Sequence, residues 1–199
     1  MKDVVITIGR QFGAGGRELG KRLAEALCIP YYDKELLEME AKNSGLSQEF
    51  LQQRDEKPVN SLLFSLVMGT RNLTGQPSLE EMVDQAQREA ICSAAEQGSC
   101  VIVGRYADAV LPSERTFRVF VSADEEQRTQ RICVRDGIGR QEAKAKMTRM
   151  DRSRAYYYEY HTQQKWGQAQ NYDLCINLSK IDMQQAVDLV LSQVQTGEK

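Results

Sequence analysis

The sequence predicts an α/β protein built on a parallel β-sheet, and three observations lead to this prediction. Val4-Val5-Ile6-Thr7-Ile8 is a continuous, mostly β-branched run, which is typical of a strand covered on both faces. A glycine-rich turn follows and leads into a segment whose apolar residues have helical spacing. Further short apolar runs then alternate with long helical patterns, which indicates parallel strands joined by helices.

The later elements follow from the same two periodicities. We expect strands at residues 29–32, 100–103, 117–121 and 174–177. An apolar stripe over residues 79–94 predicts a helix, and Ser78 with Glu81 forms a capping box at its start. A last helix is expected over residues 183–194.

Two segments interrupt this alternation within one predicted domain of residues 1–199. Residues 34–77 are helical in pattern but broken by Ser44-Gly45, Lys57-Pro58 and the glycines between 69 and 75. We expect a helical insertion there that could close over a substrate. A basic helix begins near Asp124, and Gly137 and Gly139 interrupt it as candidate hinges of a lid over residues 137–155.

Composition narrows the class of protein. Hydrophobic residues make up 41% and charged residues 27% of the 199 residues, which is ordinary for a soluble globular chain. The longest apolar runs, such as residues 4–8, are far shorter than the ~20 residues that cross a bilayer. No apolar segment typical of a secretory signal follows Met1, so we expect a cytoplasmic protein without membrane contact.

The histidine and cysteine content argues against metal and triad chemistry. His161 is the single histidine, so we expect neither a zinc site nor a histidine-based catalytic triad. The five cysteines are scattered without a C-x-x-C pair, and Cys100 and Cys175 lie in apolar runs. We therefore expect reduced thiols in the core rather than disulfides.

Positive charge is concentrated in one segment. The formal net charge is -2, yet residues 128–154 carry nine Lys or Arg residues against three acids, Asp136, Glu142 and Asp151. A local positive segment in an acidic protein favours a small anionic ligand over a nucleic acid polymer. The alternative is a solvated helix face.

The glycine-rich turn at residues 9–18 is the strongest candidate site. Glycines between a buried strand and a helix start allow a tight turn that points successive amides inward, and a phosphate is the natural ligand of such a turn. Compared with G-x-x-x-x-G-K-[ST], Gly16 stands at the lysine position and Glu18 at the hydroxyl position, so Arg17 is the candidate replacement cation. The predicted phosphate-binding residues are Gly9, Arg10, Gln11, Gly13, Ala14, Gly15, Gly16, Arg17 and Glu18.

Two other interpretations of this turn remain open. Asp33 follows the second strand at about the distance at which an acid holds a ribose in a dinucleotide fold, although the G-x-G-x-x-G pattern fails at Glu18. The turn could also bind no ligand. Asp33, Gly104 and Asn177 each follow a predicted strand, and ligands of open α/β sheets bind at that edge.

Motifs in a fixed order along the chain carry a resemblance to a known family. They are G-R-Q-F-G-A-G-G-R-E-L-G at 9–20, I-P-Y-Y-D-K-E at 29–35, V-G-R-Y-A-D at 103–108, D-R-S-R at 151–154, K-W-G at 165–167 and N-Y-D-L-C-I-N at 171–177. Together they resemble the cytidylate kinase-like family of P-loop proteins, in the nucleoside monophosphate kinase superfamily. The resemblance implies a P-loop NTPase fold with a five-stranded parallel sheet, and an acceptor monophosphate held between the insertion and the core.

The resemblance also implies roles for single residues. Tyr32 and Asp33 would open the acceptor site, and Gly104-Arg105 matches the segment whose arginine grips the acceptor phosphate. Tyr106 stands where those enzymes have an aspartate, and Asp108 is the candidate to compensate. Asp151, Arg152 and Arg154 match the D-R-x-R lid pattern, so they join Arg17 as candidate catalytic residues. Arg105, Arg152 and Arg154 could instead be surface charges, and Asp108 a helix cap.

The implied activity is transfer of the γ-phosphoryl group of ATP to CMP, dCMP or a related acceptor, with Mg²⁺ bridging the donor phosphates. The expected partners are therefore nucleotide small molecules. The alternative is a regulatory protein that binds nucleotides without turnover, and the missing lysine and hydroxyl favour it.

Overall fold

A computed structural model of the protein describes residues 3–33, 79–104 and 106–196. The predicted acceptor-binding insertion at residues 34–77 and Arg105 lie outside the described residues.

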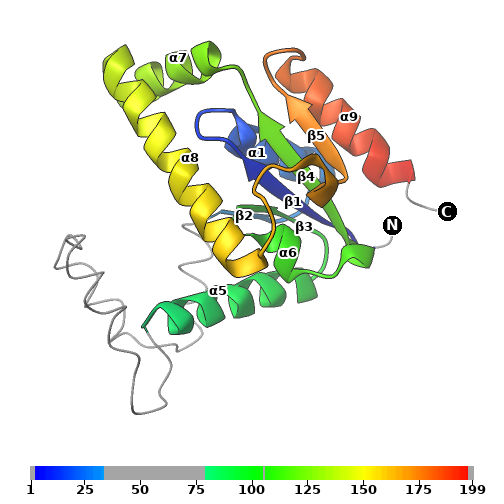
Figure 1. Cartoon of the computed structure of the whole chain (residues 1–199). Coiled ribbons are helices and arrows are strands. Elements are labelled where there is room, and N and C mark those ends of the chain that lie inside the picture. The colour runs from blue at the N-terminus through cyan, green and yellow to red at the C-terminus, as the bar shows by residue number, and fades with distance from the viewer. Residues whose placement is uncertain (1–2, 34–78, 105, 197–199) are drawn as a thin grey trace, which may run out of the picture.

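The described residues form a five-stranded sheet, as predicted. Its order is β2-β3-β1-β4-β5, and every pair of neighbours is parallel (Figure 1). The strands are β1 (Val5–Arg10), β2 (Tyr31–Tyr32), β3 (Cys100–Val103), β4 (Thr116–Ser122) and β5 (Leu174–Asn177). The first strand of the chain therefore lies at the centre, which explains its unbroken apolar run.

The helices of the described residues connect these strands. They are α1 (Gly16–Leu27), α5 (Leu79–Glu96), α6 (Ala107–Val110), α7 (Glu125–Asp136), α8 (Arg140–Thr162) and α9 (Met183–Thr196). Short 3₁₀ turns lie at Ser113–Arg115 and Ala169–Asn171. None of these helices is both long enough and apolar enough to span a bilayer.

Helices cover the sheet on both faces. Ile6 and Ile8 of β1 pack in one buried cluster with residues of α1 and α9. Val5, one position away, points to the other face and packs with residues of α5 and α6. This period of two places the core in two layers around β1.

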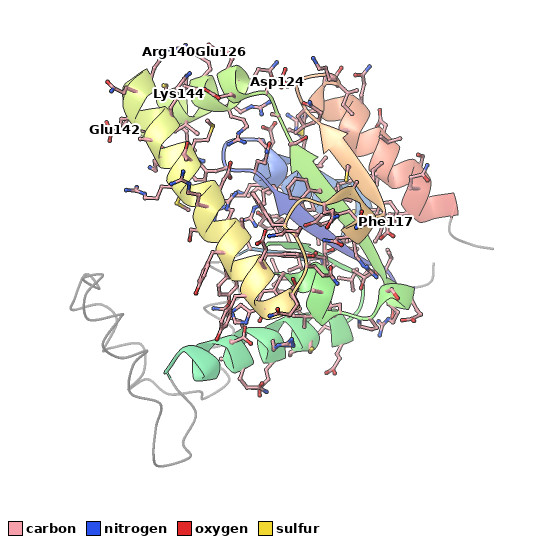
Figure 2. The ribbon with its side chains drawn as sticks, in the orientation of Figure 1. Phe117, Asp124, Glu126, Arg140, Glu142 and Lys144 are labelled. Atoms are coloured by element: carbon pink, nitrogen blue, oxygen red, sulfur yellow. The ribbon has the colours of Figure 1, made fainter. Side chains whose placement is uncertain are left out.

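Helices α7 and α8 form a hairpin beside the carboxyl end of the sheet (Figure 1). Gly137 ends α7 with a φ of 66°, and Gly139 precedes α8. The Glu126–Arg140 ion pair links the first turn of α7 to the first residue of α8 (Figure 2). Helix α8 continues to Thr162, so the predicted lid segment of residues 137–155 ends inside a helix.

The cysteines are all free thiols, but the prediction of core positions holds only in part. Cys100 on β3 is buried, and burial raises the pKa of its thiol to about 11. Cys175 is exposed, so its predicted core position is wrong. The reason is that β5 is an edge strand, which leaves alternate side chains open to solvent.

Candidate functional site

The glycine-rich turn connects β1 to α1, and two of its glycines need left-handed backbone. Gly13 has a φ of 78° and Gly15 a φ of 100°. A Cβ at Gly13 would lie 3.0 Å from the carbonyl oxygen of Arg128, which is tighter than most Cβ contacts. Gln11 fixes the turn to β4, because its amide donates to Val121 O at 3.0 Å and its Oε1 accepts from the Ala123 amide at 3.3 Å.

Arginines from α7 and α8 occupy the carbonyl side of the turn. Arg131 Nη1 donates to the oxygens of Gly13 at 3.3 Å and Ala14 at 2.8 Å. Arg128 Nε donates to Phe12 O at 3.0 Å, and Arg154 Nη1 donates to Arg10 O at 2.9 Å. The carbonyl groups of the turn are thus already hydrogen-bonded within the protein.

The amides of the turn are less engaged. Within the described residues, no hydrogen bond is donated by the amides of Gly13, Gly15 or Gly16. Gly16 is the first residue of α1, where helix amides have no intrahelical acceptor and carry partial positive charge. This combination of bonded carbonyls and unengaged amides suits an anion.

Asp151 attaches α8 to the turn. Its Oδ1 accepts from the Phe12 amide at 2.7 Å, and its Oδ2 pairs with Arg128. The side chain of Arg128 is 7% exposed and that of Asp151 is 19% exposed, so this ion pair is largely shielded from water. The guanidinium groups of Arg135 and Arg154 lie over the Phe12 ring, 4.7 and 5.3 Å from its centroid.

Positive charge exceeds negative charge around the turn. The pKa of Arg154 falls to about 10, first because the side chain is buried and then because Arg17, Arg128 and Arg135 repel its charge. Asp151 is the carboxylate that acts in the opposite direction. Arg154 keeps its charge at neutral pH, and an added anion would relieve this repulsion.

Arg17 lies on the β2 side of the turn. Its side chain is half-exposed, and Nη2 lies 3.8 Å from Asp33 Oδ2. Asp33 also accepts from the Tyr31 hydroxyl at 3.4 Å. Burial and then the Asp33 charge raise the pKa of Tyr31 to about 12, while Arg17 and Arg10 act to lower it. Two predicted residues of different sites, Arg17 and Asp33, are therefore neighbours.

Arg10 connects the turn to the end of β3. Gly104 has a φ of 88°, and a Cβ there would overlap the guanidinium group of Arg10. A Cβ at Gly16 would lie 2.7 Å from Arg10 Cβ. Both glycines are thus needed for the close approach of one arginine.

Other predicted residues lie apart from this group. Arg152 is exposed and lines a groove between α7 and α8 with Glu125 and Lys144. It does not point toward the turn as Arg154 does, because residues two apart on a helix do not share a face. Glu18 is exposed and pairs with Arg22 at 2.7 Å. Asp108 on α6 is buried and accepts from the Tyr158 hydroxyl at 2.9 Å, with no contact to the turn. Tyr32 is half-buried on β2, and Gly9 packs against Phe120 and Tyr172.

Sequence reasoning missed Phe12, Arg128, Arg131 and Arg135. The signal for the arginines was present, since all three lie in the basic segment that begins at residue 128. The segment could not indicate which of its cations turn inward, because that depends on the rotation of α7 and α8 against the turn.

The donors present fit phosphate groups directly and Mg²⁺ indirectly. Within the described residues, no group of three His, Cys, Asp or Glu side chains could hold a metal ion. Mg²⁺ is often held by phosphate oxygens, water and only one or two carboxylates, so a bound triphosphate would supply most of its ligands. Asp33 and Glu18 are acids adjoining the turn.

Comparison with curated and solved proteins gives relatives of kinase type. A cytidylate kinase from Methanopyrus kandleri is 26% identical over 166 residues, which cover 79% of this chain and 75% of the relative. The crystal structure of an uncharacterized protein from Eubacterium ventriosum is 29% identical with a TM-score of 0.74, covering 96% of this chain and 98% of that one.

More distant solved structures share the fold. Shikimate kinase from Acinetobacter baumannii, in complex with shikimate, has a TM-score of 0.55 at 13% identity and covers 100% of this chain and 96% of its own. Shikimate kinase from Bacteroides thetaiotaomicron has a TM-score of 0.52 at 17% identity, covering 96% and 98%. The model of the Cytidylate kinase-like family matches residues 5–180. The chain therefore belongs to the cytidylate kinase-like family.

Proposed function

We propose that the protein is a nucleoside monophosphate kinase-like phosphotransferase that moves the γ-phosphoryl group of ATP to CMP, dCMP or a related phosphate acceptor. The observation that carries this proposal is the arrangement of the turn. Its carbonyl groups are bonded by Arg128, Arg131 and Arg154, while three of its glycine amides donate no hydrogen bond within the described residues, those of Gly13, Gly15 and Gly16. Phosphoryl transfer requires mainly positioning and charge neutralisation, which amides and guanidinium groups supply.

In the proposed reaction, an oxygen of the acceptor phosphate attacks the γ-phosphorus while the bond to the β-phosphate oxygen breaks and ADP leaves. The turn amides would hold the donor phosphates. Arg154 and Arg17 would offset the charge that spreads over the transferring group. Mg²⁺, when bound, would offset further charge on the phosphate oxygens.

The acceptor would bind beside Arg17. Tyr32, Asp33 and Gly104 all lie at the carboxyl ends of β2 and β3, and Arg105 follows in the chain. The Arg17–Asp33 pair is the proposed link between donor and acceptor, since Arg17 could exchange Asp33 for a phosphate oxygen when ligands bind. Asp108 and Arg152 remain candidates from the motif alone.

A non-catalytic nucleotide-binding protein is the second candidate. Gly16 offers no cation at the usual lysine position, and Glu18, at the hydroxyl position, is paired with Arg22. Such a turn could bind phosphate without accelerating its transfer.

A coupled ADP-release assay separates the two functions. Full-length protein would be mixed with ATP, Mg²⁺ and each of a panel of monophosphates including CMP, dCMP, UMP and AMP, with ATP-dependent thermal stabilisation measured in parallel. Acceptor-dependent ADP release supports the kinase. Stabilisation by ATP without turnover on any acceptor supports the binding protein, and no stabilisation by any nucleotide contradicts both.

A further inference from the structure

A second polar cavity lies away from the glycine-rich turn. Its volume is about 390 Å³, and α6, the first half of β4 and the last turns of α8 supply most of its walls. Its lining includes Arg88, Tyr106, Asp108, Arg118, Tyr158 and His161. None of the residues that contact the turn lines it.

The separation from the turn follows from the strand geometry. Arg118 is three residues before Val121, whose carbonyl oxygen binds the Gln11 amide. Strand residues rise about 3.3 Å each, so the two positions are about 10 Å apart along β4. On α8, Tyr158 and His161 lie beyond Arg154, toward the carboxyl end of the helix.

Arg118 is the cation of this cavity that has no partner. Within the described part of the chain, its guanidinium group makes no ion pair and no hydrogen bond, and its Nε is buried. Buried polar groups are normally hydrogen-bonded, so an unsatisfied guanidinium nitrogen beside a cavity points to a ligand or ordered water.

His161 is held in a fixed orientation at the same cavity. Its Nδ1 lies 3.2 Å from Asp84 Oδ1, and its ring stacks on Tyr106 with centroids 5.1 Å apart and an angle of 6° between planes. Its Nε2 is buried without a partner among the described residues. The ring is thus fixed on one side and unsatisfied on the other.

The charge of the lining favours an anion. Arg88 and Arg118 are its cations, and Asp108 is the sole acid among the lining residues. Arg88 also pairs with Asp84 at 3.5 Å, whereas Arg118 makes no ion pair within the described residues and acts on Asp108 only through its charge. Burial raises the pKa of the Asp108 carboxyl, which reduces its repulsion of an anion, although the hydrogen bond from the Tyr158 hydroxyl and the charge of Arg118 act to lower that pKa.

We propose that this cavity binds a small oxyanion, a carboxylate or phosphate group of a metabolite, with Arg118 as its principal partner and His161 beside it. Arg118 and His161 are not among the residues of the proposed donor and acceptor sites, and the one shared residue is Asp108, which is an acceptor-site candidate from the motif alone. Binding in this cavity does not depend on catalysis. Arg118 would donate two parallel hydrogen bonds to the oxygens of either group.

His161 offers a direct test, because the sequence contains one histidine. The imidazole NMR signals of tag-free, full-length protein would be followed during titration with inorganic phosphate and, separately, with malonate. Chloride at equal ionic strength and pH is the reference. We expect saturable shifts with at least one of the two oxyanions, and the comparison of the two arms identifies the preferred group.

Variants assign the shifts to the cavity. Arg118→Gln should weaken the apparent affinity about tenfold or more, since hydrogen bonds to a charged group are lost. Arg115→Gln, an exposed neighbour that pairs with Asp3, and Arg154→Ala, at the turn, should retain the response. Should Arg118→Gln fail to fold, Ser113→Asp places a like charge at the exposed rim of the cavity and should weaken binding as well.

Three results would overturn the proposal. One is the absence of a saturable shift with both phosphate and malonate. Another is an unchanged response in Arg118→Gln or, in its place, Ser113→Asp. The third is competition by CMP, which would make the cavity part of an acceptor site. Each result is independent of whether the protein releases ADP from ATP.

Discussion

Arg154 and Arg152 stand two positions apart on α8, but only Arg154 reaches the turn. Arg154 is half-buried, bonds to the Arg10 carbonyl oxygen and lies over the Phe12 ring. Arg152 is exposed on the groove side of the hairpin. Of the two motif arginines, Arg154 is therefore the stronger candidate for contact with a transferring phosphate.

If the protein is a kinase, Arg154→Ala should lower kcat/KM roughly 10²- to 10³-fold, because a preorganised charge at the reacting group is removed. The kcat/KM of Arg154→Lys should lie between those of wild type and Arg154→Ala, since lysine keeps the charge but not the planar fork. Steady-state ADP release provides the measurement, with circular dichroism to verify folding. The exposed Arg149→Ala variant on the same helix should match wild type, and equal losses in both variants would contradict a specific role.

Asp108 should make stability fall as pH rises. Burial raises the pKa of its carboxyl in the folded protein, so the folded state holds a proton that the unfolded chain releases from about pH 4 upward. The free energy of unfolding of wild type minus that of Asp108→Asn should therefore decrease as the pH is raised from about 4 toward the higher pKa of Asp108 in the folded protein. Urea unfolding at a series of pH values measures the difference. Glu114→Gln, at an exposed site, is the control, and a flat Asp108 difference would refute the assignment.

At the scale of elements, Asp151 attaches α8 to the turn in addition to the hydrogen bond that Arg154 donates to Arg10 O. Asp151 accepts from the Phe12 amide and pairs with the largely buried Arg128. The cluster of Phe12, Ile132, Ala143 and Met147 adds apolar contact between the turn and the α7–α8 hairpin. The glycine-rich turn and the motif helix thus form one packed unit in this structure.

Asp151→Asn should lower the free energy of unfolding by about 3 kcal/mol. Asparagine can still accept from the Phe12 amide, but the charge of Arg128 loses its partner in a shielded position, and breaking one side of such a pair is costly. Urea unfolding measures the change. Glu126→Gln breaks the exposed Glu126–Arg140 pair and should cost less than about 1 kcal/mol. A loss no larger for Asp151→Asn than for this control would show that the shielded pair contributes little.

Two glycines allow the effect of a left-handed backbone on stability to be separated from the effect of crowding at the glycine-rich turn. Gly137→Ala adds a side chain at a φ of 66° with nothing within 4 Å, and should cost roughly 1 kcal/mol. Gly13→Ala adds one at a φ of 78° and also crowds the Arg128 carbonyl oxygen and the Ile132 side chain, each 3.0 Å away. We expect Gly13→Ala to lose more stability than Gly137→Ala, and we expect only Gly13→Ala to weaken ATP binding. Thermal melting and calorimetric titration provide the measurements, and equal effects would contradict crowding at the turn.

The elements that sequence patterns predicted well are those whose pattern depends on burial. β3 and β5 have the predicted bounds, and β1 is the expected central strand. β2 is shorter than expected, since its register with β3 includes only Tyr31 and Tyr32, although the Pro30 carbonyl oxygen accepts from the Val101 amide at 2.9 Å. The basic segment was recognised, but Arg128, Arg131 and Arg135 were not, because their contacts at the turn are more than a hundred residues away and only the packed hairpin brings them together.

At the scale of the whole molecule, ATP should stabilise the fold through the charge balance at the turn. A ligand at a hundredfold excess over its Kd adds about 2.7 kcal/mol, which for a chain of this size raises Tm by roughly 5–10 °C. The rise should shrink as salt increases, because screening weakens phosphate–guanidinium attraction. Scanning calorimetry tests this, with adenosine as the matched ligand that lacks phosphates. An equal rise with adenosine would mean that the phosphates are not the recognised group.

The central position of β1 has a consequence for how the chain reaches this structure. Val5 pairs with Cys100 on one side and with Thr116 on the other, separations of 95 and 111 residues. During synthesis β1 must therefore remain without either neighbouring strand until residues as far along the chain as Cys100 have been made. Its apolar side chains and unpaired backbone groups are exposed to mispairing throughout that interval. Nascent chains stalled before residue 116 should therefore depend on chaperones far more than the finished protein does.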